Sequence, residues 1–173
     1  MPILRIPVAS SDHIRGNINA SITLLEYGDY ECPFRKSVYS TVKQLEKHFS
    51  TQLRFVFRHF PLSEIHSNAE LAAETAEFAA AYDKFWQMHD LLHEQQKRLS
   101  IETLIELAEA LGLSGAALLE ALENKTYQAK IRSDFLGGVH TGVNGTPTFF
   151  INGYRHNGPF EFEDFVSAIS KME

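Results

Sequence analysis

The first section of the chain carries a strand pattern, a helix pattern and a second strand pattern in close succession. β-branched and aromatic residues fill positions 22–27, and positions 53–58 carry a similar run that includes arginines. Between the two runs, apolar residues recur at helical spacing among lysines over positions 38–49. A strand, a helix and a strand in this order predict a crossover unit with two parallel strands. Positions 1–20 precede this unit as a short extended piece with a turn at 15–17.

The middle section, residues 62–138, contains helix patterns and no strand pattern. The run SNAE at 67–70 has the composition of a capping box, in which the first and last side chains each bond a backbone N–H group. Ser100 and Ser114 stand where serine caps a helix, and Gly112 stands where glycine ends one. We therefore predict five helices, around positions 71–82, 85–92, 104–111, 118–122 and 127–135.

The last section, residues 139–173, returns to strand patterns. The glycine pair at 137–138 is expected to end the preceding helix, and a tight loop over 142–147 follows. The apolar run 148–151 and the Asn-Gly pair at 152–153 then predict a β-hairpin, because Asn-Gly is the strongest short turn signal. Apolar residues at helical spacing predict a closing helix: Phe162, Phe165, Val166 and Ile169.

Length and composition place the chain among ordinary globular proteins. Its 173 residues suffice for one domain with a packed core, and a content of 44% apolar and 22% charged residues excludes a disordered chain. The net charge of −6 argues against a nucleic-acid partner, and no apolar run reaches the length of a membrane span. Residues 1–8 lack the features of a secretory signal, so we expect a cytoplasmic protein without a membrane partner.

The chain has a single cysteine, Cys32, and therefore cannot close an internal disulfide. A lone cysteine is most often a small buried apolar residue. Cys32, however, follows a predicted strand and precedes Pro33 in the expected first turn of a helix, where the partial positive charge favours a thiolate. Arg35 would add positive charge, whereas Asp29 and Glu31 would oppose it. The position favours a reactive thiol.

A metal site is not predicted. His89 and His93 stand four positions apart and could share one helix face, but no third ligand with a matching spacing is present. We interpret both as ordinary helix residues. The apolar group of Phe85, Trp86 and Met88 is interpreted as core of the helical section.

Four segments resemble the DsbA-like thiol–disulfide oxidoreductases. EYGDYECP at 26–33 is similar to that family's strand and active-site segment, and FVFRHFPL at 55–62 is similar to its second strand. FWQMHD at 85–90 resembles its inserted helical region, and GVNGTPTF at 142–149 resembles its proline loop. The resemblance implies an α/β, thioredoxin-like fold with an inserted all-helical domain. Its parts would be the first part of the thioredoxin-like domain (1–61), the insertion (62–138) and the second part (139–173).

The family's pattern is Cys-Pro-x-Cys, whereas this chain has Cys32-Pro33-Phe34-Arg35. The resemblance implies that Cys32 is the nucleophile, but Arg35 stands where the resolving cysteine belongs. We therefore predict monothiol thiol–disulfide exchange, in which glutathione or another external thiol resolves the mixed disulfide. Arg35 would hold the thiolate or bind a substrate carboxylate, and Pro33 and Phe34 would shape the surface beside the thiol. No tightly bound cofactor is predicted, and glutathione would act as a co-substrate.

The resemblance also implies a cis peptide bond before Pro147, in a loop that faces Cys32. Only about 5–6% of X–Pro bonds in folded proteins are cis, so the residues alone leave a plain turn open. A cis-proline loop would let Gly145, Thr146 and Pro147 bind the backbone of a substrate as an added strand.

Two alternative functions stay open. A kappa-class-like glutathione transferase or isomerase shares the inserted helical domain and also lacks the cysteine pair. A redox-inactive peptide-binding or chaperone-like module would keep the fold without its chemistry. The predicted partner is glutathione, or a protein or peptide thiol or disulfide, and the sequence predicts no oligomeric state.

Overall fold

A mixed β-sheet forms the centre of the computed structural model, which describes residues 2–95 and 97–172. In this part of the chain, five strands lie in the order β1-β3-β2-β4-β5. β2 and β3 are parallel, and every other neighbouring pair is antiparallel. The strands are β1 (His13–Gly16), β2 (Ile22–Gly28), β3 (Leu53–His59), β4 (Thr148–Ile151) and β5 (Tyr154–Arg155).

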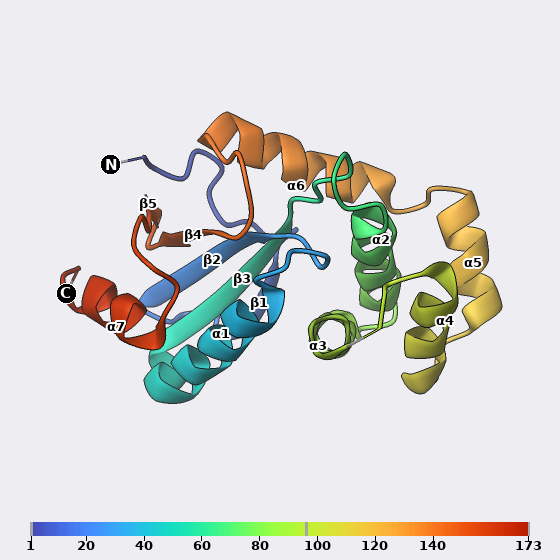
Figure 1. Ribbon diagram of the computed structural model, residues 1–173. Coiled ribbons are helices and arrows are strands. Elements are labelled where there is room, and N and C mark those ends of the chain that lie inside the picture. Colours follow the sequence, from blue (N-terminus) through green and yellow to red (C-terminus); the bar gives the residue numbers. More distant parts are fainter. Residues whose placement is uncertain (1, 96, 173) are drawn as a thin grey trace.

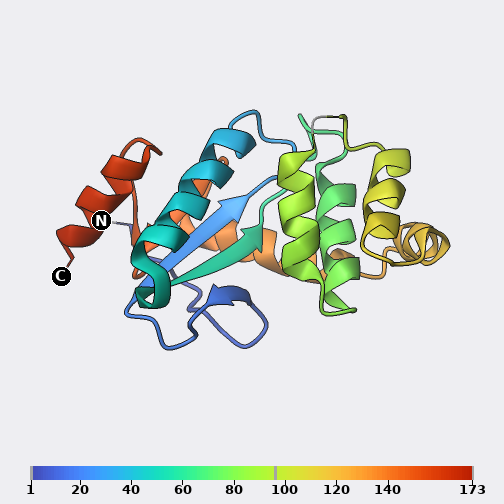
Figure 2. The same cartoon turned by 90° about the horizontal axis from the view of Figure 1, so that it is seen from below.

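Helices cover both faces of the sheet and extend the molecule on one side (Figure 1). α1 and α7 lie on one face, and α6 lies on the other. The helices α2 to α5 form a group toward which β2 and β3 point, as Figure 2 shows from below. The helices are α1 (Arg35–Phe49), α2 (Ala69–Ala80), α3 (Phe85–Glu94), α4 (Ile101–Ala110), α5 (Gly115–Glu123), α6 (Gln128–Thr141) and α7 (Phe162–Ser170), with a 3₁₀ turn η1 (Ser50–Gln52).

The central strand β2 is buried on both faces, which explains its nearly continuous apolar sequence. Successive side chains of a strand point to opposite faces. Leu24 accordingly joins the cluster that contains Val42 of α1 and Phe165 of α7. Leu25 joins a second cluster, which packs against Phe135 of α6. The sheet is thus held between two apolar layers.

Several predicted helix signals are confirmed. The hydroxyl of Ser100 accepts a hydrogen bond from Thr103 N at 3.3 Å, and the hydroxyl of Ser114 accepts one from Ala117 N at 3.1 Å. Gly112 follows α4 with φ of +76°, a left-handed conformation that glycine adopts without steric cost. These residues fix where α4 and α5 begin and where α4 ends.

The predicted capping box at 67–70 is wrong, because no side chain caps the first turn of α2. Its residues bond elsewhere instead. The hydroxyl of Ser67 accepts a hydrogen bond from Arg98, and the carboxylate of Glu70 accepts one from Gln128 of α6. Ser67 and Glu70 thus connect the start of α2 to neighbouring segments.

The prediction that glycines 137–138 end a helix is also wrong. α6 continues through both residues to Thr141 and ends at Gly142, whose φ is +89°. It therefore passes residue 138, where the helical section was predicted to end. A Cβ atom at Gly138 would lie 2.8 Å from the ring of Phe60, so glycine there serves close packing of α6 against the sheet.

The predicted hairpin at Asn152-Gly153 is confirmed. Both residues have positive φ, 48° and 85°, as the tight two-residue turn between β4 and β5 requires. Over residues 2–95 and 97–172, no helix is both long enough and apolar enough to cross a membrane.

Candidate functional site

Cys32 lies in the turn that connects β2 to α1. Cys32 N donates a hydrogen bond to Asp29 O at 3.1 Å, and Arg35 N donates one to Cys32 O at 3.0 Å. α1 begins at Arg35, so the prediction that Cys32 and Pro33 form its first turn is wrong. The side chain of Asp29 explains the difference, because it accepts a hydrogen bond from Glu31 N at 2.7 Å and closes a separate turn.

Asp29 anchors this turn to the segment that follows β3. The carboxylate of Asp29 is buried and accepts hydrogen bonds from Leu62 N at 2.9 Å and from His66 Nδ1 at 2.7 Å. A buried carboxylate with several donors holds its surroundings in one arrangement. The position of Cys32 is thereby tied to the start of the helical section.

The proline loop lies against the thiol. The Thr146–Pro147 peptide bond is cis, and Cys32 Sγ donates a hydrogen bond to Thr146 O at 3.5 Å. The carbonyl of Gly145 is occupied, because it accepts a hydrogen bond from Thr148 Oγ1 at 2.8 Å. The fold therefore brings the predicted nucleophile and the predicted substrate-binding loop together.

A small cavity lies beside the thiol. Residues from four parts of the chain line it: Glu26, Asp29, Cys32, Arg35, Val38, His93, Thr146 and Pro147. Several of its buried polar atoms have no hydrogen-bond partner within the described residues, namely Arg35 Nε, Thr146 Oγ1 and both ring nitrogens of His93. The cavity thus holds unused hydrogen-bonding capacity next to Cys32.

The electrostatic surroundings of Cys32 differ from the sequence-based prediction. Burial raises the pKa of its thiol, and the carboxylates of Asp29 and Glu26 add to this rise. Hydrogen bonds to the thiolate from the Phe34 backbone and from the Thr146 side chain lower the pKa but do not outweigh burial. The prediction that the helix start favours a thiolate is therefore wrong for the free protein, since only 5% of Cys32 is exposed.

Two further residues of the cavity carry shifted pKa values. Burial raises the pKa of Glu26 to about 8, so its carboxyl group is mostly protonated at neutral pH. Burial, together with the charge of Arg35, lowers the pKa of His93 to about 3 and keeps its ring neutral. Sequence reasoning missed both residues. The sequence does contain a signal for Glu26, because it is a charged residue inside the otherwise apolar run 22–27 and is therefore expected to be buried.

The comparisons with known proteins agree with this geometry. A sequence model of the family described as Thioredoxin matches residues 9–171. The chain belongs to the thioredoxin family. Its thioredoxin-like fold with an inserted helical group is confirmed, and this fold resembles that of DsbA-like proteins, although the chain has one cysteine.

Solved structures of thioredoxin-fold proteins superpose on nearly the whole chain. Oxidised BdbD from Bacillus subtilis has a TM-score of 0.84 at 23% identity and covers 95% of this chain and 94% of its own. A thioredoxin-like oxidoreductase from Silicibacter pomeroyi has a TM-score of 0.84 at 22% identity, with coverages of 95% and 93%. α-DsbA1 from Wolbachia pipientis has a TM-score of 0.79 at 20% identity, with coverages of 97% and 93%.

Similar curated sequences belong to much longer proteins. A protein named Na(+)/H(+) antiporter NhaA 1 from Salinispora arenicola is 40% identical over 168 residues, which is 96% of this chain and 26% of the relative. NhaA 3 from Salinispora tropica is 40% identical over 167 residues, again 26% of its length. This thioredoxin-family chain therefore spans about a quarter of these relatives.

The residue that replaces the second cysteine of the DsbA pattern points partly away from the thiol. One guanidinium nitrogen of Arg35 donates a hydrogen bond to the carbonyl oxygen of Gln95 at 3.3 Å. Phe34, beside it, leaves 60% of its surface exposed. The turn thus exposes an aromatic ring next in sequence to Arg35, whose guanidinium group reaches the end of α3.

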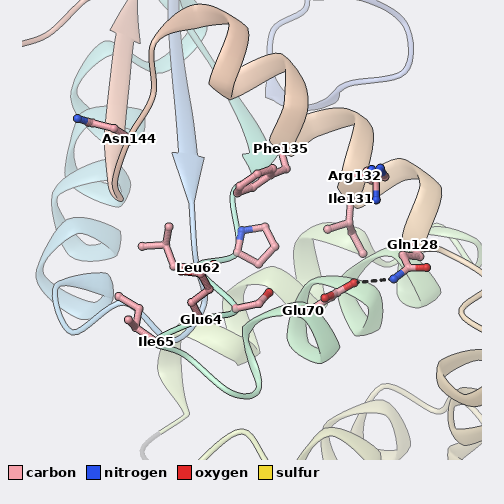
Figure 3. A pocket seen from close by; sticks show the side chains of 11 residues that line it. Leu62, Glu64, Ile65, Glu70, Gln128, Ile131, Arg132, Phe135 and Asn144 are labelled. Atoms are coloured by element: carbon pink, nitrogen blue, oxygen red, sulfur yellow. Dashed lines mark hydrogen bonds between the residues drawn. The ribbon is translucent and has the colours of Figure 1, made fainter.

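A larger groove runs along α6 (Figure 3). It has a volume of about 630 Å³ and lies between the segment after β3, α2 and α6. Figure 3 shows Leu62 and Phe135 on its apolar walls, and Glu70 bonded to Gln128 at one end. Asn144, two positions before Thr146 in the proline loop, lines it as well. Sequence reasoning did not predict this groove.

Proposed function

We propose that this chain carries out monothiol thiol–disulfide exchange at Cys32, with glutathione or another external thiol as co-substrate. The observation that supports it is the contact between Cys32 Sγ and Thr146 O at the cis-proline loop, in a chain without a second cysteine. The fold is that of a DsbA-like thiol–disulfide oxidoreductase. The missing second cysteine removes the internal resolving step of such enzymes.

The exchange consists of two displacements. The Cys32 thiolate attacks one sulfur of a substrate disulfide, an S–S bond forms, and the other substrate sulfur leaves as a thiolate. A glutathione thiolate then attacks the mixed disulfide at the substrate's sulfur and releases Cys32. Glu26 lines the same cavity, and its carboxylate can accept the thiol proton only above its pKa of about 8, where it is ionised.

The residues around the thiol have distinct roles in this proposal. Once Cys32 is bonded to a substrate sulfur, its S–H no longer occupies Thr146 O, which can then accept a backbone N–H of the substrate. Gly145 and Pro147 hold this loop in position, while Pro33 and the exposed Phe34 contact the substrate surface. Arg35, which keeps donors beyond its bond to Gln95, binds a carboxylate such as those of glutathione.

Mass spectrometry after incubation with oxidised glutathione tests the proposal. We expect one glutathione per chain on Cys32 and none on Cys32→Ser, and we expect reduced glutathione to remove the adduct. If the wild-type chain forms no adduct at a pH where Cys32 reacts with iodoacetamide, the exchange function is wrong. The cytoplasmic location, where glutathione is abundant, stays a prediction that localisation of the full-length protein would test.

A further inference from the structure

Several polar atoms of the residues that line the cavity beside Cys32 lack partners within the described part of the chain. Among the described residues, neither ring nitrogen of His93 has a hydrogen-bond partner, and only 3% of this residue is exposed. Arg35 Nε is buried and also has no partner in residues 2–95 and 97–172. A neutral imidazole offers one donor and one acceptor, and Arg35 Nε offers one donor. Since an unsatisfied buried polar group costs free energy, this arrangement points to a polar occupant.

The size of the cavity restricts that occupant. About 10 Å³ is open to the centre of a water-sized group, which is room for one oxygen atom with its hydrogens. Glutathione and peptides are far too large to enter. Cys32 lines the same cavity, so an oxygen bonded to its sulfur would meet the free donors.

We propose that Cys32 is a site of sulfenic acid formation, in which His93 and Arg35 hold the sulfur-bound oxygen. The Cys32 thiolate attacks one oxygen of a hydroperoxide, an S–O bond forms, and the O–O bond breaks. The sulfur loses two electrons, which the peroxide gains, and the departing oxygen leaves as water or an alcohol after it takes up the thiol proton. His93 acts as a positioning residue that donates to the new oxygen.

The rest of the chain favours persistence of this product. A sulfenic acid normally condenses with a nearby thiol, and the sequence contains no second cysteine. With 5% of Cys32 exposed, a small oxidant reaches the sulfur more easily than a bulky disulfide does. An external thiol can then attack the sulfenic sulfur, form an S–S bond and release water. This route leads to a mixed disulfide on Cys32, as the proposed function does, but the oxidant is a hydroperoxide and not a disulfide.

Trapping with dimedone tests the proposal. We treat the reduced protein with one equivalent of hydrogen peroxide, add dimedone after increasing delays, and locate the adduct by mass spectrometry. We expect the adduct on Cys32, and we expect the lifetime of the sulfenic acid to fall about tenfold in His93→Phe, as the loss of one hydrogen bond implies. His93→Gln keeps a donor and should restore part of the lifetime, and it also serves if His93→Phe does not fold.

A matched control separates positioning from general damage to the fold. His89 lies on the same helix and is equally buried, but it bonds Tyr30 and does not line the cavity. We expect His89→Phe, where folded, to leave the lifetime unchanged. Absence of the dimedone adduct, or equal lifetimes in wild type and both His93 variants, would overturn the proposal. Glutathione exchange is measured separately on the same protein preparations. Failure of sulfenic acid formation can therefore be distinguished from failure of the exchange function.

Discussion

The guanidinium group of Arg35 donates a hydrogen bond to the carbonyl oxygen of Gln95 at 3.3 Å, across 60 positions of sequence. Arg35 is the first residue of α1, and Gln95 is the C-cap of α3. A cation at the last carbonyl groups of a helix is favourable, because the helix dipole makes this end negative. The residue in the place of the second cysteine thus joins the thiol turn to the helical group.

Arg35→Cys is expected to create a dithiol site. The change restores the Cys-Pro-x-Cys spacing at 32–35, so mild oxidation should give an internal disulfide and a mass lower by two hydrogens. The variant should then release a glutathione adduct without added thiol, which the wild type cannot do. Thiol titration and mass spectrometry measure both effects. An oxidised variant that keeps two free thiols would contradict this expectation.

Arg35→Ser serves as the matched control, because it removes the bond to Gln95 without adding a thiol. We expect it to lose about 1 kcal/mol of unfolding free energy in urea, the typical net worth of one hydrogen bond. No internal disulfide should form. If its stability equals that of the wild type, the bond between α1 and α3 has no structural importance.

Glu77 connects three elements through one carboxylate oxygen. Its Oε2 lies 2.7 Å from His13 Nε2 and 2.8 Å from His59 Nε2, so α2 is tied to β1 and β3. The hydrogen bonds to the two histidines hold the pKa of Glu77 below its usual 4.5, although burial opposes them. A lowered pKa contributes stability above pH 4.5 that is lost as the pH falls below it.

Glu77→Gln should therefore destabilise the fold by about 2 kcal/mol at pH 7 and by less at pH 2.5, well below the unfolded value of 4.5. Urea unfolding at both pH values gives the difference. Glu106→Gln is the control, since the Glu106 side chain is 61% exposed and its change should cost little. An equal cost of Glu77→Gln at both pH values would show that its charge is unimportant.

Local signals in the sequence predicted the fold where a residue acts on its own neighbours. Ser100 and Ser114 cap helices because their hydroxyl groups reach backbone N–H groups three residues ahead. Asn152 and Gly153 form the hairpin turn because they tolerate positive φ. Gly138 misled the prediction, since its purpose is contact with Phe60, which is distant in sequence.

The site was predictable in part for the same reason. Cys32 and the loop at Pro147 were found from short motifs, and the structure places them in contact. His93 was interpreted as an ordinary helix residue, because its place in the cavity depends on how α3 packs against α1. The raised pKa of Cys32 was missed because burial cannot be read from position at a helix start.

Glu26→Gln is expected to stabilise the protein at alkaline pH. Burial raises the pKa of Glu26 from 4.5 to about 8, so the folded chain holds more protons than the unfolded chain between these pH values. Stability consequently falls as the pH rises through this window, and the cost is complete above it. Glutamine does not ionise, and the gain at pH 8.5 should be on the order of 3 kcal/mol. Urea unfolding at pH 5 and pH 8.5 tests this, and a gap between the proteins that does not widen with pH would contradict it.

The reactivity of Cys32 should depend on the same carboxyl group. Because burial raises the pKa of the thiol, the rate of alkylation by iodoacetamide should reach its midpoint above about 8.5, the value of an ordinary thiol. A Glu26 carboxylate is ionised in this range and repels the thiolate across the shared cavity. Glu26→Gln should therefore move the midpoint to lower pH, whereas Glu106→Gln should not. A wild-type midpoint below 8 would show that the helix start stabilises the thiolate more than burial opposes it.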